Sequence, residues 1–212
     1  NMKYSFIFLF VSISIFAGNI LEKEIYYTQD NQLIGEKQYL YNSRDNITET
    51  YTFQKKGIDS RCFYFYHEGK LVFSEEYAGE NSRIYYSVYI YNGEKLFKKF
   101  SYDNDEKLLF VNEYIFDSKG RLFFIKSYTS NGNIDGVREF IYESDKLIEE
   151  RFFDSNNKVF LKKVFSYEEG LIRKIEFFDY AGNKIRVVKR IYSNKTVGVS
   201  PLGYRDNFYD IK

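Results

Sequence analysis

Residue types that carry nucleophilic or metal chemistry are rare in this chain. His67 is its only histidine and Cys62 its only cysteine. A protein metal site combines several His, Cys or carboxylate ligands at short spacing, and His67 has no second His or Cys partner at such a spacing. Cys62 needs a base to form a reactive thiolate, and His67 falls at the far end of the same predicted strand. We therefore predict no metal site and no thiol nucleophile, with His67 in an exposed turn and Cys62 buried.

The carboxylates give no stronger indication of catalysis. The chain has 30 Asp and Glu residues, distributed one or two per predicted strand, which is typical of a solvated surface. Its sequence contains no phosphate-binding loop, no Ser-His-Asp order and no zinc motif. The 31 Lys and Arg residues nearly balance the acids, so the positive excess expected of a nucleic-acid-binding protein is missing. We predict a protein that is not an enzyme, uses no cofactor and binds no nucleic acid.

Aromatic residues are the unusual feature of the composition. The chain has 22 Tyr, 22 Phe and no Trp, a bias toward residue types that favour β-strands. Many precede a short polar turn that ends on Leu, Ile or Val, as in YNGEKL from Tyr91 to Leu96. The aromatic residues before turns are Tyr27, Tyr41, Phe53, Tyr66, Tyr77, Tyr91, Tyr102, Phe116, Tyr128, Tyr142, Phe153, Tyr167 and Phe178. Their spacings of 11 to 14 residues give a repeat of about 25 residues, which predicts two strands joined as a hairpin.

The segments between turns define the predicted strands. They are 33–41, 47–53, 58–66, 71–77, 84–91, 96–102, 108–116, 122–128, 134–142, 147–153, 159–167, 172–178 and 185–192. Most have seven or nine residues, and an odd length keeps both ends of a strand on one face. Only 84–91 and 185–192 have eight, where we expect either a β-bulge or an error in the assigned boundary. The fold class predicted is all-β, an antiparallel meander of about thirteen short strands in an elongated or curled repeat sheet. The pattern leaves open whether this sheet is single-layered, curled or closed.

Aromatic doublets recur at the ends of the longer strands and face the same side. They form a possible ligand-binding strip of Tyr39, Tyr41, Tyr64, Tyr66, Tyr114, Phe116, Phe140, Tyr142, Phe165 and Tyr167. Stacked aromatic residues stabilise neighbouring strands, so a structural role is one interpretation. The other is recognition of sugar rings, since tyrosine offers a flat apolar face and a hydroxyl group.

Charged residues stand side by side at the strand centres, which places charge on both faces. Examples are Lys98 and Lys99, Glu149 and Glu150, and Lys162 and Lys163. A Lys or Arg that faces lipid at mid-depth costs about 2 to 4 kcal/mol. The pattern therefore disfavours a transmembrane barrel and favours a sheet with both faces partly wet, in which cross-strand pairs compensate the charges.

The ends of the chain differ from the repeat. Lys3 precedes an uncharged apolar run from Tyr4 to Phe16, followed by Ala17 and Gly18, which is typical of a secretory signal peptide. A buried strand and an uncleaved anchor are the alternatives. Asn19 stands where a lipoprotein would have its acylated cysteine, which argues against lipidation. The predicted organisation is a signal peptide or anchor at 1–18, a lead-in with the first turn at 19–32, the hairpin repeats at 33–192, and a non-repeat cap or tail at 193–212.

Parts of the repeat resemble known families of stacked hairpins. The run from Thr129 to Leu147, TSNGNIDGVREFIYESDKL, resembles the MORN-repeat variant family, and YHEGKL at Tyr66 and YNGEKL at Tyr91 match half of that pattern. YIFDSKGRL, which begins at Tyr114, is similar to the YD repeats of large secreted RHS-type proteins. Asp145 replaces the turn glycine of the MORN-like pattern in YESDKL. Both resemblances imply stacked β-hairpins, and neither implies catalytic residues.

These observations predict an exported, non-catalytic repeat scaffold at the bacterial cell envelope that binds another macromolecule, with protein as the first candidate. One alternative is a module that binds carbohydrate or peptidoglycan through the Tyr/Phe strip. Another is a cytoplasmic MORN-like interaction or immunity protein. The expected location is periplasmic or extracellular, with membrane contact only through an uncleaved N-terminus. The oligomeric state is left open.

Overall fold

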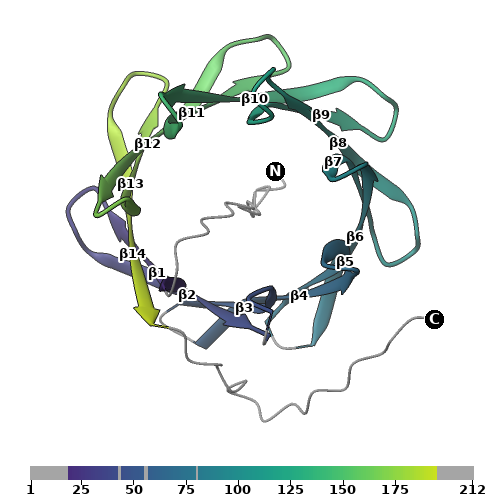
Figure 1. Ribbon diagram of the computed structural model, residues 1–212, viewed down its shortest axis with the longest axis horizontal. Helices are drawn as coiled ribbons and strands as arrows, with labels where there is room; N and C mark the ends of the chain where they lie inside the picture. Colours follow the sequence, from purple (N-terminus) through teal and green to yellow (C-terminus); the bar gives the residue numbers. More distant parts are fainter. Residues whose placement is uncertain (1–18, 43, 55–56, 80, 195–212) are drawn as a thin grey trace.

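A computed structural model describes residues 19–42, 44–54, 57–79 and 81–194. They form fourteen antiparallel strands in chain order that close into a barrel, shown end-on in Figure 1. The strands are β1 (Asn19–Thr28), β2 (Leu33–Tyr41), β3 (Ile47–Gln54), β4 (Gly57–His67), β5 (Lys70–Ala78), β6 (Ser82–Asn92), β7 (Lys95–Tyr102), β8 (Leu108–Phe116), β9 (Leu122–Thr129), β10 (Ile134–Glu143), β11 (Lys146–Asp154), β12 (Val159–Glu168), β13 (Leu171–Asp179) and β14 (Lys184–Asn194).

The all-β antiparallel meander predicted from the repeat is confirmed. The thirteen predicted segments correspond to β2 through β14, and one repeat of about 25 residues makes one hairpin of the barrel. Two expectations were wrong. The lead-in at 19–32 contains a further strand, β1, and the sheet is a closed ring because β1 pairs with β14. The predicted signal peptide at 1–18 and residues 195–212 of the predicted tail lie outside the described residues.

Bulges explain why the sheet closes. We expected them in two strands, but all fourteen strand pairings contain a register shift. In β5, for example, Leu71 pairs with Tyr66 and Phe73 with Phe65, which leaves Val72 as the extra residue. Each bulge bends its strand and increases the local twist. Repeated around the sheet, the bends bring the last strand to the first and remove both exposed edges.

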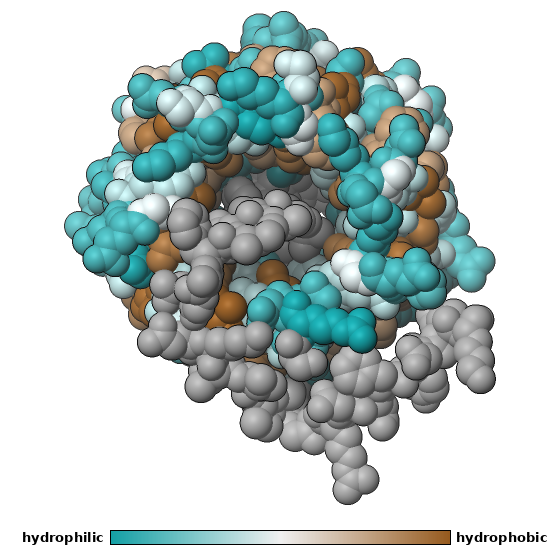
Figure 2. All heavy atoms as spheres, viewed as in Figure 1, coloured by the Kyte–Doolittle hydropathy of each residue, from teal (hydrophilic) through white to brown (hydrophobic). Residues whose placement is uncertain are grey.

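The wall of the barrel is one strand thick. Between strands, Cα atoms approach within 8 Å only for neighbours around the ring. Fourteen strands spaced about 4.8 Å apart give a circumference of roughly 67 Å and a diameter of at least about 21 Å, and strand tilt widens it further. Space-filling spheres show the described residues as a ring (Figure 2). Within the described residues, no helix has the length and apolar character needed to cross a bilayer.

Four of the turns begin with an aspartate whose side chain stabilises the turn. Asp103, Asp117, Asp154 and Asp179 each begin a turn, and one carboxylate oxygen accepts hydrogen bonds from the backbone N–H groups two and four residues later. These side-chain bonds mimic a backbone turn, which is why Asp is favoured there. Asp103 and Asp117 directly follow the last residues of β7 and β8, and Asp154 and Asp179 are the last residues of β11 and β13, so all four mark where a strand ends.

Cross-strand registers divide the side chains into an inner and an outer wall. The inner wall carries the most buried groups, including Ser87, Ser101, Glu150 and Lys163, all 0 % exposed. Two apolar clusters also lie there. The first contains Phe165, Ile172, Ile175 and Val188. The second contains Tyr64, Leu71 and Tyr89. The core of this protein is therefore a layer on the inside of the ring.

Candidate functional site on the inner wall

The ten residues of the predicted aromatic strip all lie on the inner wall, in two levels near one rim. The level nearest the rim, here called the mouth tier, consists of Tyr41, Tyr66, Tyr91, Phe116, Tyr142, Tyr167 and Tyr192. Two residues further in lies the deep tier, which consists of Tyr39, Tyr64, Tyr89, Tyr114, Phe140 and Phe165. Arg190 takes the seventh place of the deep tier. Each even-numbered strand contributes one residue to each level, so the strip is a band around the ring.

Sequence reasoning missed the doublet Tyr89 and Tyr91 on β6 and the pair Arg190 and Tyr192 on β14. Their strands had been assigned an even length, which obscured the common face. The signal was present, because Tyr91 lies before a predicted turn and Tyr89 stands two residues earlier, as in the other doublets. Arg190 breaks the aromatic pattern at the seam where the barrel closes.

One type of hydrogen bond holds most tyrosines of the mouth tier in place, and it recurs from one sequence repeat to the next. Five tyrosine hydroxyl groups of this tier each donate a hydrogen bond of 2.8 to 3.1 Å to the backbone carbonyl oxygen of the residue that stands 20 positions earlier. These tyrosines are Tyr41, Tyr91, Tyr142, Tyr167 and Tyr192. The acceptor lies at the start of the preceding strand. This bond ties the two strands of a hairpin together at the rim.

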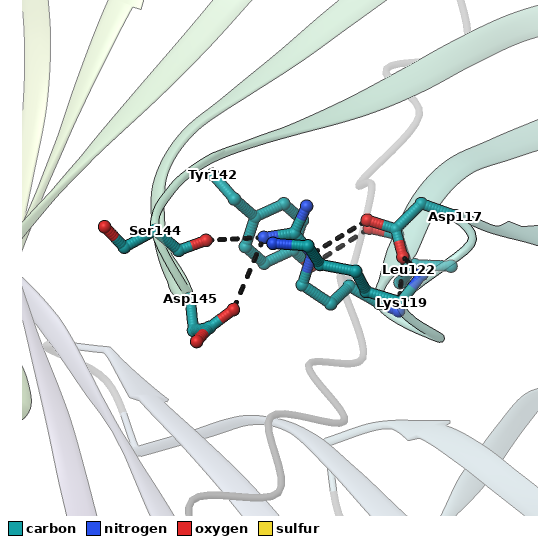
Figure 3. Close-up of polar contacts among 7 residues, drawn as sticks. Asp117, Lys119, Leu122, Tyr142, Ser144 and Asp145 are labelled. Carbon is teal, nitrogen blue, oxygen red and sulfur yellow. Dashed lines mark hydrogen bonds and ion pairs between the residues drawn. The ribbon is translucent and has the colours of Figure 1, made fainter.

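Basic side chains cover the same rings. Lys70 lies over Tyr91, Lys95 over Phe116, Arg121 over Tyr142 and Lys146 over Tyr167, with cation-to-centroid distances of 4.6 to 5.8 Å. Figure 3 shows the contacts around Tyr142 and Asp117. The guanidinium of Arg121 donates to a carboxylate oxygen of Asp117 at 2.8 Å and to the carbonyl of Ser144 at 2.5 Å. Cation–π contacts therefore cap the mouth tier from the turns.

The deep tier is anchored by polar groups of the wall itself. Tyr39 donates to Glu24 at 3.0 Å. The hydroxyl of Tyr64 lies 3.4 Å from that of Thr50, and the hydroxyl of Tyr89 lies 3.0 Å from that of Ser74. Tyr64 and Tyr89 are buried, and Tyr39 is half-buried. These phenol hydroxyls are thus satisfied within the protein, and what remains of the side chains is mainly ring surface.

A buried ion pair joins the two strands that close the ring. Arg190 Nε lies 2.8 Å from Glu24 Oε1, and Tyr26 also donates to Glu24, at 2.9 Å. Burial alone would raise the pKa of Glu24, but the positive charges of Arg190 and Lys37 outweigh it and hold that pKa below its ordinary value. Burial acts to lower the pKa of Arg190, and the charge of Glu24 more than reverses this, so the pKa of Arg190 is raised. The pair is therefore charged at neutral pH.

A second buried pair lies on β11 and β12. Lys163 Nζ is 3.1 Å from Glu150 Oε2, and Arg138 Nε on β10 is 3.3 Å from Glu150 Oε1. Lys163 also lies over the rings of Phe152 and Phe177 at 4.7 and 5.2 Å. Burial lowers the pKa of Lys163 to about 8, although Glu150 opposes the change. Here two cations share one carboxylate.

A third group of charges surrounds Glu76. Its carboxylate accepts a hydrogen bond from Tyr85, and Lys37 and Lys99 act on it electrostatically. Burial raises the pKa of Glu76 against these influences. Burial also lowers the pKa of Lys99 to about 8, and Glu76 opposes that change. Lys99 lies 5.4 Å from the ring centroid of Phe110. We call Lys37, Glu76 and Lys99 the lysine cluster.

Cys62 and His67 lie apart from any catalytic arrangement in the described structure. Cys62 is half-buried on the inner wall of β4, and burial raises the pKa of its thiol to about 12. A thiol with that pKa is protonated and poorly nucleophilic at neutral pH. His67 is exposed at the end of β4. Among the described residues, no group of three or more His, Cys, Asp or Glu side chains is placed to hold a metal ion.

The outer wall carries ion pairs at the middle of the strands. Arg61 and Glu49 approach to 3.1 Å, and Arg151 approaches Glu149 to 2.6 Å and Glu139 to 3.7 Å. Cross-strand registers also place Lys98, Glu113 and Lys126 opposite one another on β7, β8 and β9. Exposed apolar side chains stand among these charges: Phe65, Ile90, Phe97 and Phe123, each 40 to 44 % exposed. The outer wall thus combines paired charges with exposed apolar side chains.

Two cavities accompany these walls. A groove of about 290 Å³ on the outer wall is lined by Lys98, Phe100, Val111, Glu113 and Tyr128, among others. A cavity of about 240 Å³ lies where β1 and β2 meet the end of β14, and Tyr39 and Tyr41 of the predicted strip contribute to it.

The fold defines a fourteen-stranded antiparallel β-barrel, and comparison with known proteins supports that class. No family model matches the sequence, and no curated protein matches it. A porin-like protein from Bacteroides vulgatus has a similar structure, with a TM-score of 0.51 and 12% identity over 82% of this chain and 98% of that protein. A porin-like protein from Bacteroides uniformis gives a TM-score of 0.47 and 10% identity over 82% and 96% of the two chains. The first of these similarities supports the barrel fold. The resemblance to MORN and YD repeats stays a prediction.

Proposed function

We propose that this protein is a non-catalytic binding protein of the bacterial cell envelope, a barrel surrounded by water that holds its ligand against the inner wall. One observation carries the proposal. Aromatic tiers line the inner wall, while ion-paired charges occupy the middle of the outer wall. A transmembrane barrel has the opposite arrangement, with an apolar band outside and a polar interior.

The outer wall supports a barrel in water rather than in lipid. Charged side chains face outward near the middle of strands around the ring, for example Lys23 on β1, Lys98 on β7 and Lys162 on β12. Each Lys or Arg at the bilayer midplane would cost about 2 to 4 kcal/mol, so these three alone would cost about 6 to 12 kcal/mol, which is as large as the whole stability of an ordinary domain. In water Lys23 and Lys162 form weak surface ion pairs with Glu36 and Glu149, and Lys98 is solvated at little cost.

The inner wall supports binding rather than catalysis. Its tiers present ring faces in a regular band, and its buried charges pair with one another without the nucleophile, base and orienting group that a reaction requires. We also propose that the protein is exported to the cell envelope, on the basis of its signal-like N-terminal sequence. A macromolecular partner on the mixed outer wall is compatible with this function.

The proposal is tested by expressing the full chain with its N-terminal segment and fractionating the cells. We expect the protein in the periplasm or medium, and we expect it to stay monodisperse in size-exclusion chromatography without detergent. A protein that enters the membrane fraction, resists carbonate extraction and needs detergent to stay in solution would refute the barrel in water. Circular dichroism shows whether the protein is folded, both when it is recovered without detergent and when it is recovered from the membrane fraction.

A further inference from the structure

Two inner-wall lysines have no ion-pair partner among the residues that the structure describes. Lys99 and Lys37 are only 9 and 7 % exposed, yet no described carboxylate oxygen lies within 4.0 Å of either Nζ. The carboxylate that both act on, Glu76, is itself engaged by the hydroxyl of Tyr85. Arg190 and Lys163 of the inner wall, by contrast, each have a carboxylate in contact, Glu24 and Glu150. Lys37 also acts on Glu24, its cross-strand neighbour, but Glu24 is already paired with Arg190. Three cations, Lys37, Lys99 and Arg190, therefore share the two carboxylates Glu24 and Glu76, and one positive charge of this part of the wall stays unbalanced.

An excess buried cation is costly unless an anion balances it. We propose that the lysine cluster binds the anionic head group, a carboxylate or phosphate monoester, of an amphiphile whose apolar body lies against the aromatic tiers. This inference rests on the proposed function and names the ligand class for the same inner wall. The head group would approach Lys99 and Lys37, and the body would extend past the deep tier toward the mouth tier.

The tiers favour an apolar body over a sugar. Sugar recognition needs many free hydrogen-bonding groups, but most tyrosine hydroxyls of the two tiers are already engaged by the wall. Tyr39, Tyr91 and Tyr167 donate to a carboxylate or a carbonyl, and Tyr64 and Tyr89 share hydrogen bonds with the hydroxyls of Thr50 and Ser74. Their remaining surface is the ring face, which contributes apolar contact area. Neighbouring rings supply this surface directly beside the cluster, since Lys99 pairs with Tyr89 of the deep tier and lies close to Phe110.

The barrel is wide enough for such a ligand. Its diameter of at least about 21 Å exceeds the reach of side chains from opposite walls, which extend roughly 6 Å each when fully stretched. Barrels of about eight strands are filled by their own side chains, and those of 16 to 18 strands leave a channel. A barrel of fourteen strands lies nearer the second case.

The absence of tryptophan from the sequence allows a local reporter. We would introduce Phe110→Trp beside Lys99 on the inner wall, with Phe100→Trp on the outer wall of β7 as the matched control. The probes share a twelve-carbon chain and differ in head group: dodecanoate, dodecyl phosphate, neutral dodecyl maltoside and cationic dodecyltrimethylammonium, all below their micelle concentrations. Acetate and inorganic phosphate test the head group alone.

We expect dodecanoate and dodecyl phosphate to change the Phe110→Trp fluorescence saturably, with little effect on Phe100→Trp. Lys99→Met should weaken this binding at least tenfold, whereas Lys99→Arg and the outward-facing control Lys98→Met should retain it. Circular dichroism and thermal melting confirm that each variant is folded, and Lys37→Met provides a second loss-of-charge variant.

The outcomes separate the inference from the proposed function. Equal affinity for all four head groups, or unchanged binding in both folded variants Lys99→Met and Lys37→Met, would overturn the anionic head group and leave inner-wall binding intact. Inorganic phosphate that binds as tightly as dodecyl phosphate would overturn the apolar body. Failure of every probe, together with binding of a glycan at the inner-wall reporter, would replace the amphiphile with a sugar. If nothing changes the inner-wall reporter in a folded barrel, the inference and the binding part of the proposed function both fail.

Discussion

Lys98 and Lys99 are consecutive residues of β7, yet their side chains lie on opposite sides of the barrel wall. Lys99 pairs with Tyr89 and Asn112 on the inner wall, where it is 9 % exposed. Lys98 faces outward opposite Glu113, with Nζ 4.9 Å from the ring centroid of Phe97. Two residues of one type therefore have different electrostatic environments, and each serves as the control for the other.

Lys99 should make stability depend on pH in the mildly alkaline range. Burial lowers its pKa to about 8 in the folded protein from an ordinary 10.5, so the unfolded chain holds the proton more tightly. The free energy of unfolding should therefore rise as pH increases from about 8 toward 10, by up to roughly 3 kcal/mol, because the buried charge is removed. Lys163 contributes a rise over the same pH range, because burial lowers its pKa to about 8 as well. Lys99→Met should therefore make the rise smaller without abolishing it, and Lys98→Met should leave it unchanged. Urea titrations at pH 7.5, 8.5 and 9.5 measure the free energy of unfolding. If its pH dependence were the same in Lys99→Met and Lys98→Met, Lys99 would not be a source of the rise.

Arg190→Met should destabilise the barrel strongly because it leaves Glu24 buried without its cation at the closing seam. Breaking a buried pair in this way costs about 3 to 5 kcal/mol. Lys174→Met is the matched control, since its 3.1 Å pair with Glu176 is partly exposed on the outer wall and should contribute less than about 1 kcal/mol. The double variant Glu24→Met/Arg190→Met should recover much of the loss. Urea unfolding checks all three, and equal losses for Arg190→Met and Lys174→Met would show that the seam needs no ion pair.

Tyr167→Phe should remove the 2.9 Å hydrogen bond to the carbonyl of Leu147 while keeping the ring in the mouth tier. The expected loss of stability is about 0.5 to 1.5 kcal/mol, the usual net contribution of one such bond. Tyr180→Phe removes a hydroxyl from a side chain that is 83 % exposed and should change nothing measurable. Thermal melting of the two variants makes the comparison. A Tyr167→Phe protein as stable as the parent would mean that the repeated rim bond is not a stabilising contact.

Gly35→Ala should be more damaging than Gly136→Ala. At both sites the added methyl group meets the backbone of the neighbouring strand, and the approach is closer at Gly35. At Gly136 the new Cβ would lie 2.7 Å from the carbonyl oxygen of Phe153, and at Gly35 it would lie closer still to that of Phe53. Forced repacking of this kind costs about 1 to 3 kcal/mol. The two midpoints of urea unfolding give the ranking, and the reverse order would refute the close approach at Gly35.

Local features of the barrel were predictable because they depend on neighbouring residues. Polar turns after aromatic residues fixed the positions of β2 through β14, and strands of odd length placed both ends of Leu108–Phe116 on one face. β1 was missed because no repeated aromatic and turn precedes it. The inward direction of the aromatic doublets was not predictable, since alternation shows that residues share a face and not which face becomes the interior.

By itself, the sequence determined an antiparallel meander of two-strand repeats, its turn positions and the common face of the aromatic residues, because turn chemistry and side-chain alternation act over a few residues. Only the tertiary structure decided that the sheet closes, that Glu24 meets Arg190 from 166 residues away, and that Lys99 lies inside while Lys98 lies outside. Closure depends on the summed bend of many bulges, and each bulge is a shift in pairing between two strands that a single strand's sequence does not specify. The physical reason is that register and curvature belong to pairs of strands, whereas strand and turn propensities belong to the chain.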